Sequence, residues 1–232
     1  MEKETAIPGL EERKLPEFNA MQRVKRRFFA MRNGDLAQQM AERGARYRIN
    51  FGLNLPQVSE IARDFLPGGK EHMAVYGGQP PLPEDLDMAD FARRLRDNTS
   101  TRESMLIAPM LFPVEALSEE EALEWMRSVP TPEVADVLCL KLLRNHPSAA
   151  RMVGTLLYET SSGDCVLLSS GPESCGLVCY TALRLLLNLL QAGQIGAGEA
   201  QKLIDAAGNA GSLLTSSVIH QIREEIKFLG EE

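Results

Sequence analysis

Helix signals recur along almost all of this 232-residue chain, and they constrain its fold more than any other feature. Between Phe18 and Met31 the apolar residues follow one another at intervals of three or four, which is the spacing of one face of an α-helix. Asn54 precedes a first turn that contains proline, and Ser118 stands three residues before Glu121, so both positions are typical of helix starts. The second spacing predicts a capping box, in which the Glu121 side chain reaches back to the Ser118 amide. No Asn-Gly or Asp-Gly turn lies between alternating apolar segments, and so the sequence predicts no β-hairpin.

These signals divide the chain into a series of helices joined by short turns. They predict helices at 18–31, 35–44, 55–66, 85–96, 101–112, 118–128, 131–144, 148 onward, 176–192, 199–207 and 212–229, while residues 163–171 fit either a short strand or a helix. From residue 85 onward the helices pair at intervals near the ~40 residues of HEAT-type repeats. We therefore predict an all-α fold, a HEAT-like-repeat α-solenoid of antiparallel helix pairs, and a compact α-bundle is the alternative. The predicted domain covers residues 17–232 and follows an N-terminal tail of residues 1–16.

The sequence shows no feature of a membrane or secreted protein. The longest apolar run, residues 181–190, is interrupted by Arg184 and Asn188 and is too short to span a bilayer. The charged N-terminal residues lack the apolar core of a signal peptide. Four cysteines do not indicate a disulfide framework, because a chain of this length can bury a core without one. We expect a cytoplasmic protein that does not bind membranes.

Metal and nucleotide motifs are also missing from the sequence. The three histidines lack the spacing of a metal site, and Cys175 and Cys179 share a helix face without a further ligand nearby. Neither a phosphate-binding glycine loop nor a G-x-S-x-G elbow occurs. We therefore expect no metal ion and no cofactor.

Charge is distributed unevenly, although the net charge is −7. The first 66 residues contain twelve Lys and Arg against nine Asp and Glu, whereas the rest contains thirteen against twenty-three. A row of cations can bind the phosphates of a nucleic acid by releasing counterions. The candidates for phosphate contact are Arg23, Lys25, Arg26, Arg27, Arg43, Arg46 and Arg48. The alternative is a solvated helix face whose charges are balanced by acids elsewhere.

Three segments together resemble one known family. The sequence Phe51-Gly-Leu-Asn-Leu-Pro56, followed by Ile-Ala-Arg at 61–63, resembles the F-G-(I/V)-x-x-P…(I/L)-A-(K/R) stretch of the AlkD-type DNA alkylation repair proteins, which are HEAT-like-repeat alkylpurine DNA glycosylases. The helix that starts at Arg102 and the arginine-led helix at Arg151 are similar to helices of the same family. The resemblance covers residues 18–228, and its first segment is the specific one.

The resemblance implies a superhelix whose concave, positively charged groove binds double-stranded DNA. Members of the family excise cationic alkylpurines by cleaving the N-glycosidic bond. They use an aspartate in a W-D-x-V-D-type motif and an arginine from the following helix. In this chain Arg151 matches that arginine, so we place it near the centre of the groove.

The chain departs from the family at the catalytic motif. Residues 134–138 align with it, which puts Val134 at the tryptophan position and Leu138 at the position of the catalytic aspartate. Asp136 stands two residues earlier, about 200° around a helix, so it would face away from the groove. We predict an AlkD-like DNA-binding protein that has lost glycosylase chemistry, with Asp136 and Arg151 as the first residues to test for catalysis. The alternative is a non-enzymatic scaffold that binds a basic protein.

Overall fold

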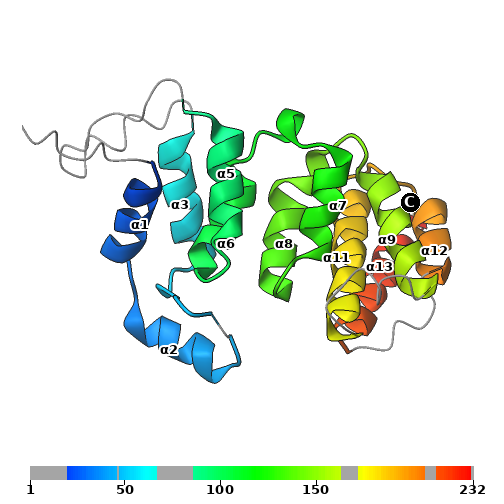
Figure 1. Cartoon of the computed structure of the whole chain (residues 1–232). Helices are drawn as coiled ribbons and strands as arrows, with labels where there is room; N and C mark the ends of the chain where they lie inside the picture. Colours follow the sequence, from blue (N-terminus) through cyan, green and yellow to red (C-terminus); the bar gives the residue numbers. More distant parts are fainter. Residues whose placement is uncertain (1–19, 46, 67–85, 163–171, 207–212, 231–232) are drawn as a thin grey trace, which may run out of the picture.

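The computed structural model describes residues 20–45, 47–66, 86–162, 172–206 and 213–230 (Figure 1). In these residues every regular element is a helix, apart from one isolated β-bridge between Ile49 and Thr101. The prediction of an all-α fold is therefore confirmed for this part of the chain. The helices are α1 (Ala20–Ala30), α2 (Gly34–Glu42), α3 (Leu55–Phe65), α5 (Met88–Asp97), α6 (Arg102–Leu111), α7 (Glu119–Arg127), α8 (Pro132–Lys141), α9 (Ala149–Ser162), α11 (Pro172–Gln191), α12 (Ala197–Ala206) and α13 (Leu213–Gly230), with short 3-10 turns at η1 (Val114–Ala116) and η2 (Leu143–Asn145).

The capping signals of the sequence set most helix starts. Asn54 forms a complete capping box with Gln57, in which each side chain accepts from the other residue's backbone N–H at 2.9 Å. Ser118 also caps its helix, because its hydroxyl accepts from the Glu121 backbone N–H at 3.1 Å. The predicted reciprocal bond from Glu121 is replaced, since that carboxylate accepts two bonds from Arg93 instead.

Two helix starts differ from the predicted ones by three residues or more. Helix α5 starts at Met88, three residues later than predicted, because the Asp87 carboxylate accepts from the backbone N–H groups of Ala89 and Asp90 and so forms the cap. Helix α11 starts at Pro172, four residues earlier than predicted. The ambiguous segment 163–171 lies outside the described residues.

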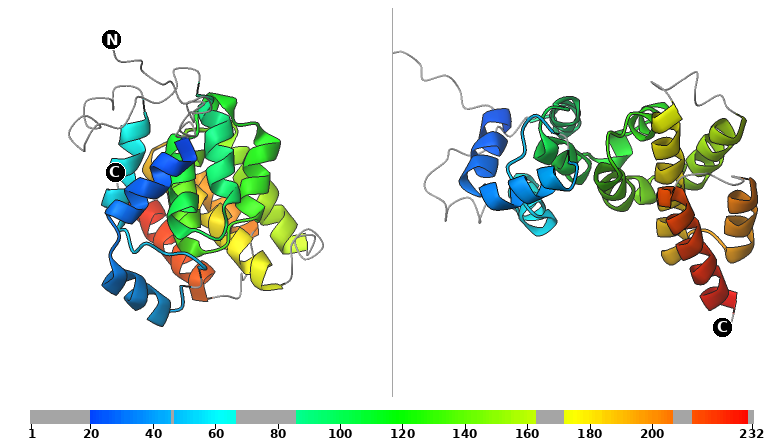
Figure 2. Two further views of the ribbon diagram at one scale, coloured as in Figure 1. Left: turned by 60° about the vertical axis from the view of Figure 1, so that its left-hand side comes forward. Right: turned by 90° about the horizontal axis from the view of Figure 1, so that it is seen from below.

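The helices form two rows. In one row α3, α6, α8, α11 and α13 follow one another, and each packs on the next. In the other row α1 packs on α5, α7 on α9 and α9 on α12, and hydrogen bonds from Arg93 to Glu121 connect α5 to α7. Figures 1 and 2 show this succession from α1 at one end to α12 and α13 at the other. A single cluster of buried apolar residues runs between the rows from Ala20 to Ile222.

Ion pairs repeat along the rows at a nearly constant sequence separation. Arg93 of α5 pairs with Glu121 of α7, 28 residues away. Arg127 of α7 pairs with Glu159 of α9, 32 residues away. Arg102 of α6 pairs with Glu133 of α8, 31 residues away. Three junctions between successive helices, α5–α7, α7–α9 and α6–α8, are thus joined by Arg–Glu pairs at similar separations.

The segment between α2 and α3 is held by α6. The Glu103 carboxylate, which is fully buried, accepts from the backbone N–H groups of Phe51 and Leu53 at 3.1–3.3 Å. The neighbouring Arg102, 1% exposed, donates to the Leu53 carbonyl at 2.8 Å and pairs with both Glu103 and Glu133. Burial disfavours the charge of Arg102, but the bonds to Glu133 and Glu103 outweigh it and raise its pKa.

Gly52 is required by the close approach of this segment to the start of α2. Its φ angle is +71°, which side chains rarely adopt. A Cβ atom at this position would overlap the Asn33 carbonyl oxygen and lie 2.7 Å from the Ala37 backbone nitrogen. Only glycine fits here without a shift of the backbone.

None of the helices in the described ranges combines the length and the apolar character needed to cross a membrane.

Candidate functional site

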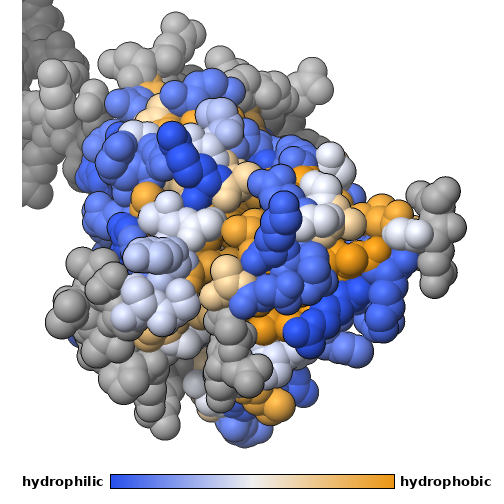
Figure 3. All heavy atoms as spheres, turned by 90° about the vertical axis from the view of Figure 1, so that its right-hand side faces the viewer, coloured by the Kyte–Doolittle hydropathy of each residue, from blue (hydrophilic) through white to orange (hydrophobic). Residues whose placement is uncertain are grey.

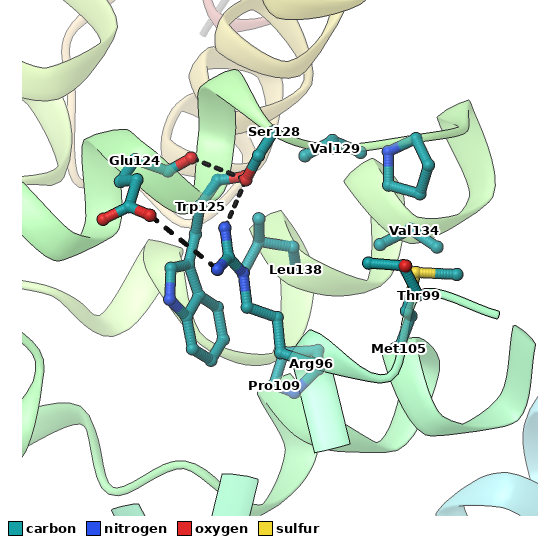
Figure 4. Close-up of a pocket in the computed structure, with 11 residues that line it drawn as sticks. Arg96, Thr99, Met105, Pro109, Glu124, Trp125, Ser128, Val129, Val134 and Leu138 are labelled. Atoms are coloured by element: carbon teal, nitrogen blue, oxygen red, sulfur yellow. Dashed lines mark hydrogen bonds and ion pairs between the residues drawn. The ribbon is translucent and has the colours of Figure 1, made fainter. Parts of the chain in front are cut away.

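A cavity of about 220 Å³ lies where α5 and α6 meet α7 and α8 (Figure 4). We call it the α5–α8 cavity. Its walls are formed by Arg96, Thr99, Met105, Pro109, Glu124, Trp125, Ser128, Val129, Pro130, Val134 and Leu138. The cavity therefore lies at the junction of two successive helix pairs, between residues 96–109 on one side and 124–138 on the other.

The lining is divided by polarity. Its floor is apolar and buried, and consists of Met105, Pro109, Trp125, Val129, Val134 and Leu138. Its mouth is formed by the exposed residues Thr99, Glu124, Ser128 and Pro130. An apolar pocket with a few polar groups at one side is the usual form of a small-molecule site.

Arg96 lies against Trp125 at the edge of the floor. The Arg96 guanidinium lies over the indole ring, with its carbon 5.2 Å from the ring centroid. The same guanidinium donates to the Ser128 hydroxyl and forms ion pairs with Asp97 and with Glu124, as the dashed lines to Ser128 and Glu124 in Figure 4 show. The rings of Phe112 and Trp125 pack edge to face, with their centroids 5.2 Å apart, and this contact helps to orient the indole. The charge of Arg96 is thus balanced by two acidic side chains, and the Trp125 ring is held between Arg96 and Phe112.

A proline inside α6 contributes to the cavity wall. Pro109 has no backbone N–H, so the carbonyl of Met105 lacks the donor that an ordinary helix would provide four residues later. A proline ring also pushes against that carbonyl and keeps the two turns apart. Pro109 and Met105 both line the cavity, at the place where α6 departs from regular helical bonding.

Helix α8 presents different residues to the cavity and to α11. Val134 and Leu138, four residues apart on one face, line the cavity. Asp136 lies on another face, where its carboxylate accepts a 2.9 Å hydrogen bond from the Tyr180 hydroxyl and pairs with Arg184 at 2.7 Å, both on α11. The catalytic candidate Asp136 is therefore engaged in helix packing and does not line the cavity, whereas Val134 and Leu138, the two positions that the resemblance places at the family's motif, do.

Arg151, the second catalytic candidate, is also held by a neighbouring helix. Its guanidinium pairs with Glu119 at the start of α7 and donates to Ser148 at 3.1 Å, while its side chain stays 70% exposed. The hydrogen bond from Arg151 lowers the pKa of Glu119. Arg151 pairs with α7 and Asp136 with α11, and neither lines the α5–α8 cavity, so these contacts do not bring the two catalytic candidates together.

The basic residues of the N-terminal helices fall into two groups. Arg23 and Arg27 point inward and are only 2% and 8% exposed, and Arg27 pairs with Asp64 at 2.6 Å. Burial also lowers the pKa of Arg23. Both side chains thus differ from the exposed cations expected at a phosphate-binding surface.

The other cations of this set are exposed. Lys25 and Arg26 lie on the outer face of α1, and Arg43 and Arg48 lie after α2. Within the described residues Lys25, Arg43 and Arg48 form no ion pair. Arg46 lies outside the described residues.

One exposed aromatic ring accompanies these cations. Phe29 of α1 is 59% exposed, and the Arg32 guanidinium lies 3.8 Å from its ring centroid. A cation and an aromatic ring at the surface beside Lys25 and Arg26 are the side-chain types that contact phosphates and bases.

Of the residues that line the α5–α8 cavity, only Val134 and Leu138 stood out in the sequence, through the family resemblance. No motif in the sequence indicated Arg96 or Trp125. One signal was present, namely a proline at position 109 inside an apolar helical run, because such a proline marks a place where a helix departs from regular packing.

In the part of the chain that the structure describes, no three His, Cys, Asp or Glu side chains gather in a way that could hold a metal ion. The buried His146 has a packing role, since its Nε2 contacts the Leu117 carbonyl at 3.0 Å and its Nδ1 accepts from the Ser148 backbone N–H at 3.1 Å.

Comparison with models of protein families, with curated proteins and with solved structures gives no significant match to this chain.

Proposed function

We propose that this chain is an AlkD-like, HEAT-like-repeat protein that binds double-stranded DNA and does not excise bases. Two features of the fold support the HEAT-like part. Helices follow one another in two rows, and equivalent Arg–Glu pairs join successive helices at separations of 28–32 residues. A stack of helix pairs with nearest-neighbour contacts is the architecture of such solenoids.

The observation that carries the proposal is the character of the α8 face at the cavity. Val134 and Leu138 align with the tryptophan and the catalytic aspartate of the family, and both line the α5–α8 cavity. Stabilising the positive charge that develops on a sugar as its glycosidic bond breaks requires a nearby carboxylate. Leu138 offers none, and Asp136 is turned towards Tyr180 and Arg184. This arrangement supports recognition without cleavage.

The exposed cations supply the proposed DNA contact. Lys25, Arg26, Arg43 and Arg48 are exposed on the N-terminal helices and the segment after α2. If these four cations neutralise four phosphates, the logarithm of the binding constant falls with a slope of about −3.6 against the logarithm of the salt concentration. This slope corresponds to a loss of about 100-fold in affinity when the salt concentration is raised fourfold.

The test is duplex binding, measured by fluorescence anisotropy at low and high salt, with a matched pair of variants. The double variant Lys25→Gln/Arg48→Gln removes two proposed contacts, and Lys202→Gln/Arg223→Gln removes one lysine and one arginine that are exposed on α12 and α13. We expect the first variant to weaken binding and to reduce the salt slope by about two, while the second leaves the slope unchanged. Equal effects of both variants would refute the proposed surface.

A second measurement separates binding from catalysis. Alkylated duplex DNA is incubated with the protein, and the release of 7-methylguanine and 3-methyladenine is compared with the spontaneous rate. We expect no release above that rate. Excision by the wild-type protein would show that the catalytic carboxylate lies elsewhere, and excision unchanged in Asp136→Ala would exclude Asp136.

One observation favours the alternative of a protein-binding scaffold. Helix α13 exposes several large apolar side chains, among them Leu213 at 90% and Phe228 at 62%. Figure 3 shows apolar side chains at the surface of the end of the molecule where α12 and α13 lie. Failure to bind duplex DNA even at low salt would leave this scaffold function, with a basic protein as partner, as the better explanation.

A further inference from the structure

We infer that the α5–α8 cavity is a binding site for a compact, uncharged and mainly apolar small molecule that contains one aromatic ring or two fused rings. The site differs from the proposed phosphate-binding surface on α1 and after α2, because its lining begins at Arg96 and ends at Leu138. The inference holds whether or not the protein binds DNA.

The size of the cavity limits the ligand. A cavity of about 150 Å³ lined by apolar side chains is sufficient to bind benzene. The α5–α8 cavity has about 220 Å³, which is room for a substituted single ring or a fused pair of rings. It is smaller than the ~300–1,000 Å³ that is typical of drug-sized ligands. A nucleotide or a peptide would therefore not fit inside it.

The chemistry of the floor requires an uncharged ligand. Met105, Val134 and Leu138 have no polar side-chain group that is able to bind a charge. Arg96 is the one cation among the lining residues, and it already contacts Ser128, Asp97 and Glu124. A carboxylate or an ammonium group would lose its hydration without gaining a partner in such a place.

The same chemistry disfavours a nucleobase. The edges of a base carry several donors and acceptors, and sites that read a flipped base bind those edges by hydrogen bonds. The floor offers the indole edge, thioether and aliphatic groups instead. Buried without partners, the polar edges of a base would be costly.

An aromatic ligand gains specific contacts that an aliphatic one does not. The Trp125 ring prefers edge-to-face or offset contacts with another ring, and the thioether of Met105 packs favourably against ring edges. Both residues are only 4% exposed and are fixed by their neighbours, so the site is largely formed before a ligand enters.

The position of Trp125 provides a direct assay, because it is the only tryptophan of the chain. The probe is 4-bromobenzyl alcohol, whose bromine quenches indole fluorescence on contact. Two brominated probes of similar size serve as chemical controls: 4-bromobenzoate carries a negative charge, and 5-bromouracil carries the polar edges of a base. We expect saturable quenching by the neutral alcohol and at least tenfold weaker binding of both controls.

Two variants fill the cavity, and one serves as the matched control. Leu138→Phe and Val134→Phe each add volume to its floor. Leu140→Phe makes the same kind of change on α8 but at a residue that is 41% exposed and does not line the cavity. We expect the first two variants to weaken binding of the alcohol at least tenfold and the third to bind it like the wild type. Circular dichroism verifies that each variant is folded.

A competition experiment uses only the wild-type protein, so it remains decisive if the cavity-filling variants do not fold. Unbrominated benzyl alcohol, added to the wild-type protein with bound probe, should restore the Trp125 fluorescence as it displaces the brominated ring. Quenching that rises linearly with probe concentration and is not reversed by benzyl alcohol would overturn the inference. So would equal binding of the neutral and charged probes, or equal binding by folded Leu138→Phe and Leu140→Phe.

Discussion

Replacement of Glu103 by alanine should be among the most destabilising single substitutions in this protein. The side chain is fully buried, and it accepts hydrogen bonds from two backbone N–H groups, those of Phe51 and Leu53, and from the guanidinium of Arg102. In Glu103→Ala these donors lose their acceptor and remain buried. Each unsatisfied buried donor costs about 1–3 kcal/mol. Breaking a buried ion pair by removing one partner costs about 3–5 kcal/mol.

These two figures describe the same lost contacts and are not additive, so we expect a decrease of about 3–5 kcal/mol in the free energy of unfolding. The decrease is a large part of the ~5–15 kcal/mol that is typical of a native protein. Urea denaturation measures it directly. With an m-value of about 2.5 kcal/mol/M, the midpoint should fall by roughly 1.5 M.

Two further variants show whether the reasoning is correct. Glu103→Gln keeps the size and one acceptor but loses the charge, so we expect a smaller cost of about 2 kcal/mol. Glu133→Ala removes the other partner of the buried Arg102. Because the Glu133 side chain is 38% exposed, water can reach the donors that it leaves, and the cost should be about 1–3 kcal/mol, smaller than for Glu103→Ala. If Glu103→Ala and Glu133→Ala had equal costs, the buried acceptor would not be what fixes the segment before α3.

Three other predictions concern backbone fit, alkaline stability and an inward-facing charge. Gly52→Ala should lower the urea midpoint by several tenths of a molar unit or more, since a Cβ there overlaps the Asn33 carbonyl, whereas Gly196→Ala, which has open space, should not. Burial raises the pKa of Cys139 far above its ordinary value of 9.0. The unfolded chain therefore loses this proton first, and the free energy of unfolding should fall as the pH rises above about 9. Cys139→Ala should reduce this dependence on pH by up to about 1.4 kcal/mol per pH unit, and an unchanged dependence would contradict the role given to the Cys139 thiol. Asp64→Ala breaks the buried pair between Asp64 and Arg27 and should lower the free energy of unfolding, measured by urea denaturation, by more than the ~1 kcal/mol expected for Asp90→Ala at an exposed pair.

The helices could be predicted from the sequence because their signals are local. Asn54 and Ser118 were expected to cap helices, and both do so through the predicted side-chain oxygen. The partner of the Glu121 carboxylate was predicted incorrectly, because a capping box considers only neighbours in sequence. In the structure an arginine 28 residues away competes for that carboxylate and forms two bonds to it.

The cations show the same limit of local reasoning. A run of Arg and Lys in α1 predicts a charged face, but an α-helix places residues three and four apart on one side. Arg23 and Arg27 share the buried side with Val24 and Phe28, whereas Lys25 and Arg26 share the exposed side. Which side faces the core depends on packing against other helices. The sequence therefore predicted a cation-rich segment but not which of its side chains face the core.

The residues that carry the family resemblance have clear structural reasons to be what they are. In the Phe51–Pro56 segment, Gly52 is fixed by a close backbone approach, Leu53 by burial and by Glu103, and Asn54 by its capping box. A segment whose residue types are set by packing predicts an architecture, because any chain with that architecture meets the same constraints. It does not predict an activity, which depends on the groups at the site. The fold is therefore tested at Gly52 and Glu103, whereas the proposed loss of glycosylase chemistry needs its own test, at the α5–α8 cavity that Val134 and Leu138 line.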